Sequence, residues 1–319
     1  MKILANDGIS KSGIDRLTEQ GCTVITTNVA QEELINYINN EQIDVILVRS
    51  ATKVRKDIID ACPSLKIIGR GGVGMDNIDV EYARSKGLKV INTPAASSAS
   101  VAELVFAHLF GGLRFLHLSN REMPLNGETQ FKALKKAYAK GIELRGKTIG
   151  IIGIGRIGTE VAKIALGLGM KVLYADHSTT ARTVELDFFD GQKLNFELKA
   201  SPLDKVLAES DFITLHIPAQ ENYVIDQNEL EQMKNGAVLI NAARGGVVSE
   251  KALLAALEQG KLRFAALDTF EDEPQPSIKL LMHEDLSLSP HIGAATVEAQ
   301  DRIGEELAEQ ILVFKAELV

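Results

Sequence analysis

Three side chains in the second half of the chain could together move a proton and hold an anion. Arg244 lies in the stretch NAARGG, Glu273 in DTFEDEP and His291 in SPHIG. A histidine can accept a hydroxyl proton near neutral pH, and a carboxylate on its other ring nitrogen would fix the tautomer. An arginine fork could grip a substrate carboxylate. Taken singly, each residue is more typical of a turn or a structural contact, so the catalytic prediction rests on the set of three.

A glycine-rich motif, GIGRIG, would supply a dinucleotide cofactor for this chemistry. It spans residues 153–158, and its expected cofactor contacts are Gly153, Gly155, Arg156, Ile157 and Gly158. A strand-like run precedes the motif, a helical pattern follows it, and a second strand ends at Asp176, at the spacing of a ribose-binding acid. Asp176 would repel a 2′-phosphate, which favours NAD over NADP, although nearby Arg182 would suit NADP. The alternative, a glycine turn without a ligand, does not account for this context.

A second glycine motif, GRGGVG at residues 69–74, follows a strand of the first half. The next strand ends without an acid for a ribose, so we do not expect a second dinucleotide site. Backbone N–H groups and the guanidinium of Arg70 are better suited to a small anion. Arg49 and Ser50 end another strand on the same edge of the predicted sheet and add a second cation. A plain tight turn remains the alternative.

Short apolar strands alternate with helical patterns along nearly the whole chain, which predicts an α/β fold with parallel sheets covered on both faces. The expected strands are 2–5, 23–27, 45–49, 66–69 and 89–92 in a first series, and 148–153, 171–176, 212–217, 238–241, 264–268 and 286–289 in a second.

Helices are expected between these strands. A long helix should cover 97–118, with a capping box from Ser100 to Glu103, and a last helix should cover 297–316. Ser201-Pro202 should begin another helix. The stretch 119–145 reads as irregular and lysine-rich, and 181–200 as a loop with a possible short hairpin.

Composition narrows the class of protein. The 319 residues are 45% hydrophobic and 24% charged, which suggests about two globular domains. The net charge of −8 argues against nucleic acid but allows an anionic small molecule in a locally cationic site. Cys22 and Cys62 lack CxxC spacing, and no histidines have metal-ligand spacing, so neither a disulfide nor a metal is expected. Without a signal-peptide region or an uncharged apolar span, the prediction is a cytoplasmic protein with no membrane contact.

These stretches together resemble the D-isomer-specific 2-hydroxyacid dehydrogenases over essentially the whole chain. The matching segments are GIGRIG at 153–158, NAARGGV at 241–247, DTFEDEP at 268–274 and SPHIGAA at 289–295. VRSATKV at 48–54, IGRGGVGMDNID at 68–79 and the segment 92–103 look most like the family's D-3-phosphoglycerate dehydrogenases. The resemblance implies two Rossmann-like, doubly wound domains. Residues 1–95 plus 290–319 would form a discontinuous, flavodoxin-like substrate domain, and residues 96–289 an NAD-binding domain.

The resemblance also implies residue roles. Arg244 would anchor the substrate carboxylate, while Glu273 would support His291 as the acid/base. Further cofactor contacts would be His216, Pro218, Ala243 and Asp268. Arg49 and Arg70 would bind a substrate phosphate, together with Ser50 and with backbone contacts from Gly71, Gly72 and Val73. A homodimer or higher homo-oligomer is implied, with one lysine of 132–140 as a candidate for donation across subunits.

The implied activity is NAD-dependent oxidation of D-3-phosphoglycerate to 3-phosphohydroxypyruvate, the first step of serine synthesis. Two alternatives stay open: the same chemistry on glycerate/hydroxypyruvate, glyoxylate or D-lactate, and an NAD(H)-sensing, corepressor-like binding protein. His177 stands where the family often has proline, and 177–200 is longer and more polar than usual, which affects the expected adenine-side contacts. The chain ends at Val319, so a short form without the serine-sensing ACT domain is expected.

Overall fold

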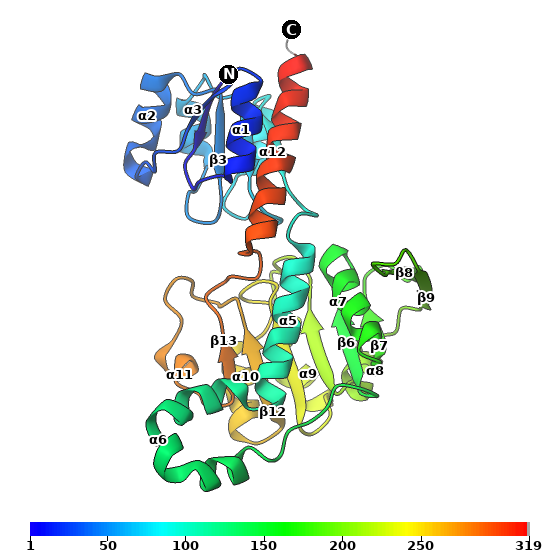
Figure 1. The fold of residues 1–319 in the computed structure, drawn as a ribbon. Helices are drawn as coiled ribbons and strands as arrows, with labels where there is room; N and C mark the ends of the chain where they lie inside the picture. Colours follow the sequence, from blue (N-terminus) through cyan, green and yellow to red (C-terminus); the bar gives the residue numbers. More distant parts are fainter. Residues whose placement is uncertain (318–319) are drawn as a thin grey trace. The chain divides into compact units, whose positions relative to one another are not determined.

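The computed structural model describes residues 1–317 of the chain, which divides into two α/β units. Unit 1 comprises Met1–Ser100 together with the chain from Ala294 onward, and unit 2 comprises Val101–Gly293. The chain thus leaves unit 1, builds all of unit 2 and then returns (Figure 1). Each unit has its own parallel sheet with helices on both faces, so the expected α/β class with two Rossmann-like sheets is confirmed.

Unit 1 is built on a five-stranded parallel sheet with the flavodoxin-like order β2-β1-β3-β4-β5. The strands are β1 (Lys2–Ala5), β2 (Thr23–Ile25), β3 (Val45–Val48), β4 (Ile67–Arg70) and β5 (Lys89–Asn92). The helices are α1 (Lys11–Glu19), the 3-10 turn η1 (Gln31–Glu33), α2 (Leu34–Glu41), α3 (Lys56–Ala61), α4 (Val80–Ser85) and α12 (Val297–Glu317). All four residues of β3 are buried, because helices cover both faces of the sheet.

The first and last helices of unit 1 pack closely side by side on one face of its sheet (Figure 1). A Cβ atom built on Gly13 of α1 would lie 2.9 Å from the Cα atom of Gly304 in α12. A Cβ atom on Gly304 would lie 2.0 Å from the Ser10 hydroxyl oxygen. Gly13 therefore lies too close to the backbone of Gly304 for a side chain, and a side chain at Gly304 would displace Ser10. Helix α12 thus belongs to the core of unit 1 although it follows unit 2 in the sequence.

Unit 2 contains a six-stranded parallel sheet with the order β13-β12-β11-β10-β6-β7. The strands are β6 (Thr148–Ile152), β7 (Lys171–Ala175), β10 (Phe212–Leu215), β11 (Ala237–Asn241), β12 (Leu262–Leu267) and β13 (Leu286–Leu288). The helices are α5 (Ser98–Leu113, which begins in unit 1), α6 (Leu116–Ala137), α7 (Arg156–Gly167), α8 (Leu203–Glu209), α9 (Gln227–Gln232), α10 (Glu250–Glu258) and α11 (Ile278–Leu281). Helices α5 and α7 cover one face, and α8, α9 and α10 cover the other.

The strand order of unit 2 reverses between β6 and β10, and at such a point the carboxyl ends of neighbouring strands splay apart to leave room for a ligand. Both predicted series of strands are present, and most ends agree within two residues. Strands such as β3, β10 and β11 are buried along their whole length, so their short apolar runs identify them.

The long-helix prediction was wrong in its extent. Helix α5 ends at Leu113, Phe115 has a left-handed backbone with φ of 56°, and α6 follows where an irregular stretch was expected. Helix α6 contains no buried residue, includes Pro124 and leaves helical geometry at Gln130, so it lacks the apolar periodicity that predicts a helix. The expected capping box at Ser100 lies inside α5, since that helix begins at Ser98.

Two other local expectations had different outcomes. Helix α8 begins at Leu203, one residue later than expected, with Pro202 at its N-cap and no side-chain cap. The possible hairpin exists as β8 (Arg182–Asp187) paired antiparallel with β9 (Lys193–Leu198). Val184 is fully buried against the core that α7 helps to form, which fixes the hairpin to the outer side of unit 2 (Figure 1).

Within the described residues, no single helix is long and apolar enough to cross a membrane, whereas α5 and α6 meet the length and composition test only as a pair bent by 54°.

Candidate active site

The glycine turn after β6 has the geometry that a dinucleotide requires. Gly153 has a φ of +94°, and a Cβ atom there would lie 2.5 Å from the carbonyl oxygen of His216. A Cβ atom on Gly158 would lie 2.1 Å from the carbonyl oxygen of Gly153, so the helix can pack on the turn only through glycine. By contrast, a Cβ atom on Gly155 would meet nothing within 4 Å. That open space lets a ligand approach the backbone, and it is where a pyrophosphate fits.

Helix α7 begins directly after Gly155, which is its N-cap and provides no side chain to bond the first N–H groups. Those N–H groups and the helix dipole favour an anion. Arg156 and Ile157 form the first turn, and Arg156 is exposed beside the open space. The residues present therefore fit the phosphates of NAD.

Asp176 follows β7, the strand next to the glycine turn. One carboxylate oxygen accepts the Ile154 N–H at 2.8 Å and the other accepts the Ser178 N–H at 3.0 Å. Burial would raise the pKa of Asp176, but these two N–H groups and Arg182 lower it below the usual value. The carboxylate is thus kept charged beside the glycine turn, as a ribose-binding acid must be.

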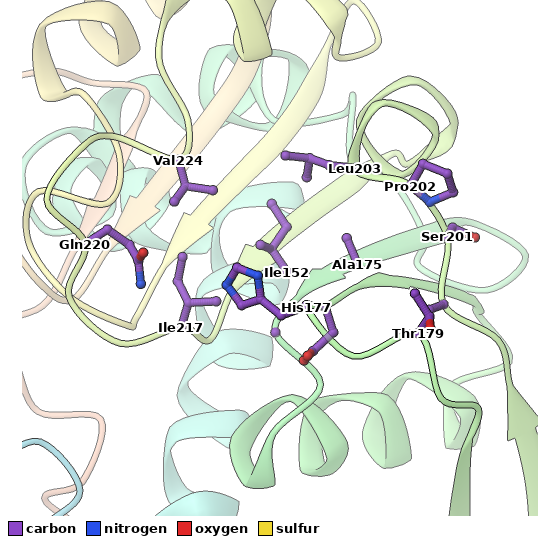
Figure 2. Close-up of a pocket in the computed structure, with 13 residues that line it drawn as sticks. Ile152, Ala175, His177, Thr179, Ser201, Pro202, Leu203, Ile217, Gln220 and Val224 are labelled. Carbon is purple, nitrogen blue, oxygen red and sulfur yellow. The ribbon is translucent and has the colours of Figure 1, made fainter.

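A pocket of about 460 Å³ opens beside Asp176, at the point where the strand order reverses (Figure 2). Ile152, Ala175 and Leu203 give it apolar walls, while Asp176 lies at its edge. The remaining lining residues are Gly153, His177, Thr179, Ala200, Ser201, Pro202, Ile217, Gln220 and Val224. An apolar slot next to a ribose-binding acid suits an adenine ring.

Most of this lining was not predicted as a site. Residues 200–203 come after the β8–β9 hairpin, and no motif marks them as part of a site. Ser201-Pro202 was expected only as the start of a helix, and the other signal is that these residues follow a stretch whose length departs from the family pattern. Thr179 and Ala200 flank the two ends of the hairpin, so the longer segment 177–200 contributes directly to this pocket.

His216 and Pro218 follow β10 on the other side of the turn. The His216 Nε2 atom lies 2.9 Å from the Thr214 hydroxyl oxygen, and burial lowers the pKa of His216 to about 3. The ring is therefore neutral at pH 7. The carbonyl oxygen of His216 lies so close to Gly153 that it leaves no room for a side chain there. Pro218 is exposed and its carbonyl oxygen accepts the Gln220 side-chain amide at 3.1 Å. Their contacts with the cofactor stay predictions.

His291 and Glu273 form the pair expected from the sequence. The His291 Nδ1 atom lies 2.8 Å from a Glu273 carboxylate oxygen, and the other carboxylate oxygen accepts the Phe270 N–H at 3.0 Å. The two side chains are 40% and 36% exposed, so a substrate can reach them. With Nδ1–H donated to the carboxylate, the lone pair of Nε2 is left to accept a proton.

Arg244 lies on a turn that Asn241 shapes after β11. The Asn241 side chain donates to the Arg244 carbonyl oxygen at 2.8 Å and accepts the Ala243 N–H at 3.0 Å. A Cβ atom on Gly245 would lie 1.8 Å from the carbonyl oxygen of Phe270. Because that glycine allows the close approach, the Arg244 turn packs directly against the loop that carries Glu273. Ala243 is buried within this turn.

Asp268 is buried at the end of β12 and acts as an acceptor for the loop around His291. Its carboxylate accepts the Ser289 hydroxyl at 2.6 Å and the N–H groups of Ile292 and Gly293 at 2.8 Å each. The structure therefore gives Asp268 a definite part in positioning that loop, and its expected contact with the cofactor stays a prediction.

The predicted substrate residues Arg49, Ser50 and Arg70 all belong to unit 1. Arg49 and Arg70 stand at the carboxyl ends of the adjacent strands β3 and β4. Burial lowers the pKa of Arg49, while Asp7 acts in the opposite direction, and the buried Arg49 Nε atom has no hydrogen-bond partner among the described residues. Ser50 is exposed beside Arg49.

The expected backbone contacts of the second glycine motif with a substrate stay predictions, and two of its three N–H groups have acceptors within the chain. The N–H of Gly71 donates to the Val48 carbonyl oxygen at 2.9 Å, and that of Gly72 donates to the Arg70 carbonyl oxygen at 3.0 Å. Only the Val73 N–H of these three has no acceptor among residues 1–317. Gly72, with φ of +143°, has another role: a Cβ atom there would lie 1.5 Å from Arg70 Nη1, so glycine makes room for that guanidinium.

The part of the chain that the structure describes contains no group of three or more His, Cys, Asp or Glu residues placed to hold a metal ion. Cys22 and Cys62 are both buried thiols.

The chain is similar to known proteins along most of its length. The family model described as D-isomer specific 2-hydroxyacid dehydrogenase, NAD binding domain, matches residues 106–293. The hydroxypyruvate reductase of Thermotoga maritima is 41% identical over 317 residues, which cover 97% of this chain and 97% of that protein. The D-3-phosphoglycerate dehydrogenase of Methanocaldococcus jannaschii is 40% identical over 321 residues, and the chain spans 58% of its length.

A solved structure shows the same fold with ligands bound. The D-lactate dehydrogenase of Aquifex aeolicus, complexed with NAD and lactic acid, superposes with a TM-score of 0.76 at 28% identity. The match covers 99% of this chain and 96% of that one.

Proposed function

Because the chain belongs to the family of D-isomer-specific 2-hydroxyacid dehydrogenases, we propose that it oxidises D-3-phosphoglycerate to 3-phosphohydroxypyruvate with NAD. The observation that carries the proposal is the His291–Glu273 pair, with 2.8 Å between Nδ1 and the carboxylate. NAD, when bound, supplies a nicotinamide ring that takes up a hydride. The substrate class is a D-2-hydroxy acid, and the phosphate is the finer part of the proposal.

The chain's own residues have separate tasks in this reaction. The Nε2 atom of His291 accepts the proton of the C2 hydroxyl group as that carbon becomes a carbonyl. Glu273 stabilises the imidazolium that results and keeps Nδ1 as the donor. Arg244 holds the substrate carboxylate with its planar fork and polarises the adjacent carbonyl in the reverse direction.

The two arginines at the carboxyl ends of β3 and β4 support a phosphorylated substrate. Arg49 keeps a buried nitrogen without a partner among the described residues, and Gly72 makes room for the Arg70 guanidinium. Guanidinium groups on adjacent strands suit a dianionic phosphate, since charge-assisted bonds to phosphate are roughly twice as strong as neutral ones. The relative named D-3-phosphoglycerate dehydrogenase, at 40% identity, points the same way.

A second candidate is reduction of hydroxypyruvate. The relative of that name is 41% identical and matches along 97% of its own length, so similarity alone does not rank the two substrates. The chemistry at His291 is the same for both. What separates them is the need for a phosphate-binding group.

The test compares substrates and arginine variants. NADH oxidation is followed with 3-phosphohydroxypyruvate, hydroxypyruvate, pyruvate and glyoxylate. Replacing Arg49 by Gln should lower kcat/KM for the phosphorylated substrate by about 10–100-fold, because one charge-assisted hydrogen bond contributes about 1.5–3 kcal/mol. The value for hydroxypyruvate should stay nearly unchanged. An equal loss for both substrates, or a wild-type preference for hydroxypyruvate, would argue for the second candidate.

A catalytic control separates an enzyme from an NAD(H)-binding sensor. His291 has a left-handed backbone with φ of 53°, a conformation that asparagine tolerates well. His291→Asn should therefore keep the fold and NADH binding but lose at least about 100-fold in kcat, the usual contribution of a general base. A wild-type protein that binds NADH yet turns over none of the four substrates would favour the sensor.

We also propose that two copies associate through α5 and α6. Phe110, Leu125 and Phe131 on these helices are 45%, 79% and 57% exposed, although all three are large and apolar. Large apolar side chains exposed in this way are typical of a subunit interface. Light scattering should give the mass of two or more chains, and a single-chain mass at micromolar concentration would contradict this part of the proposal.

A further inference from the structure

A buried row of polar side chains lies behind the His291 loop in unit 2. His108, on α5, places its Nδ1 atom 2.8 Å from the Ser287 hydroxyl oxygen and its Nε2 atom 2.9 Å from the Ser289 hydroxyl oxygen. The Ser289 hydroxyl in turn bonds to Asp268 at 2.6 Å. His108, Ser289 and Asp268 are 7%, 8% and 2% exposed, so solvent does not substitute for these bonds.

The donor and acceptor roles along this row follow from the chemistry of each group. The Asp268 carboxylate only accepts, so Ser289 donates its single hydroxyl proton to it. The Ser289 oxygen must then accept from His108, which places the ring proton on Nε2. In a neutral ring, Nδ1 is left to accept the Ser287 hydroxyl proton. Burial lowers the pKa of His108, which agrees with a neutral ring.

The bonds of this row hold the chain both before and after His291 in the sequence. Ser289 lies two residues before His291, and its hydroxyl is held between His108 and Asp268. Immediately after His291, the N–H groups of Ile292 and Gly293 both donate to the same Asp268 carboxylate. Between these fixed points His291 has a left-handed φ of 53°, a conformation that few residues other than glycine adopt.

We propose that His108 is a positioning residue for the reaction, which acts through Ser289 and Asp268 to hold His291 in its left-handed conformation with Nε2 presented to the substrate. His108 itself touches neither the pair nor the pocket. The proposal rests on the proposed role of His291 as the base. His108 would then have a function in the reaction in addition to its place in the core.

The first test compares two substitutions at position 108. His108→Leu removes both bonds, whereas His108→Gln can still donate an amide N–H to Ser289 from nearly the place of Nε2. We expect the Leu variant to lose roughly tenfold or more in kcat, part of what a general base contributes. The Gln variant should recover most of that loss. The dissociation constant for NADH, followed by its fluorescence, should change less than twofold in both.

Two further variants provide controls. His117→Leu removes a neighbouring histidine that bonds only weakly to the Gly111 carbonyl oxygen, at 3.4 Å, and it should leave kcat unchanged. Ser289→Ala should lose about as much kcat as His108→Leu, and the double variant should lose no more than either alone. Additive losses of kcat in the double variant would overturn the proposal. So would a His108→Leu variant with the kcat of the wild type, or one whose loss of kcat equals the fraction of its molecules that are unfolded.

A spectroscopic measurement keeps this inference separate from the proposed function. Long-range ¹H–¹⁵N spectra of the imidazole rings should show the Nε2–H tautomer for His108 in the wild type. They should also show a change in the His291 nitrogen signals on His108→Leu. A wild-type protein inactive on every substrate would contradict the proposed function. Unchanged His291 signals in the Leu variant would contradict the positioning role, whatever the activity.

Discussion

At the scale of single residues, the three glycines of the cofactor turn are needed for three different reasons. Gly153 is fixed by its positive φ, Gly158 by its contact with the Gly153 carbonyl oxygen, and Gly155 by the open space around it. The fold requires glycine at positions 153 and 158, whereas the ligand requires it at position 155. Substitutions at positions 155 and 158 should therefore have opposite consequences.

Gly155→Ala should weaken cofactor binding while the fold stays intact. Its Cβ atom would enter space where nothing lies within 4 Å, and its φ of −68° suits alanine. We expect the Kd for NADH to rise at least about tenfold, or about 1.4 kcal/mol, because the methyl group would fill part of the open space that the pyrophosphate is expected to use. The melting temperature should change little.

Gly158→Ala is the matched comparison for Gly155→Ala. A Cβ atom 2.1 Å from a carbonyl oxygen forces the helix off the turn, and such overpacking costs about 1–3 kcal/mol or more. We expect a clear fall in melting temperature by calorimetry. Equal stability losses at both positions would mean that the space around Gly155 is not reserved for a ligand.

A second prediction at this scale concerns acid stability. Burial lowers the pKa of His216 to about 3, whereas an unfolded chain titrates its histidines near pH 6.5. Below pH 6.5 the unfolded chain therefore binds a proton that the folded chain does not. The free energy of unfolding should fall as the pH drops from about 6.5 toward 3, by up to about 1.4 kcal/mol per pH unit from this group.

Urea denaturation at pH 7 and pH 5.5 measures this effect. His216→Gln should reduce the difference in unfolding free energy between the two pH values by about 1 kcal/mol. His177→Gln, on an exposed position, serves as the control and should leave the difference unchanged. A pH dependence that His216→Gln does not reduce would contradict the assignment of a buried neutral ring.

At the scale of elements, the contact between α1 and α12 decides whether unit 1 holds together. Gly304→Ala would place a Cβ atom 2.0 Å from the Ser10 hydroxyl oxygen and 3.1 Å from its Cβ atom. We expect a loss of about 1–3 kcal/mol, since either the helix or the start of α1 must shift. Gly167→Ala, at the exposed end of α7 with nothing within 4 Å, is the control. If both variants melt alike, the close approach of the two helices does not limit stability.

Some of these elements could be predicted from the sequence and others could not. Buried strands such as β3 and β11 could be predicted because all four residues of β3 and the first four residues of β11 are apolar. Helix α6 could not, because none of its residues is buried and its apolar positions show no period. The β8–β9 hairpin was foreseen only as a possibility, since one face of each strand is polar and exposed.

At the scale of the whole molecule, the candidate site could be predicted only for residues that lie in a recognisable sequence motif. The His291–Glu273 pair was expected because each residue lies in a motif of its own. The bond between His108 and Ser289 joins residues 181 positions apart, and no local pattern indicates it. The same holds for the pocket beside Asp176, whose walls come from segments after four different strands.

The double crossing of the chain also has a consequence for synthesis on the ribosome. Unit 2 is complete once Gly293 has been made, and its two cores draw only on residues of that continuous stretch. The core of unit 1 needs Ile303, Leu307 and Ile311 of α12, which are translated only after the whole of unit 2. At about 5–20 residues per second, the first hundred residues wait on the order of ten seconds or more for their final helix. During that interval the exposed face of the β1–β5 sheet is a natural target for chaperones, so the part of the chain that is made first is the last to fold.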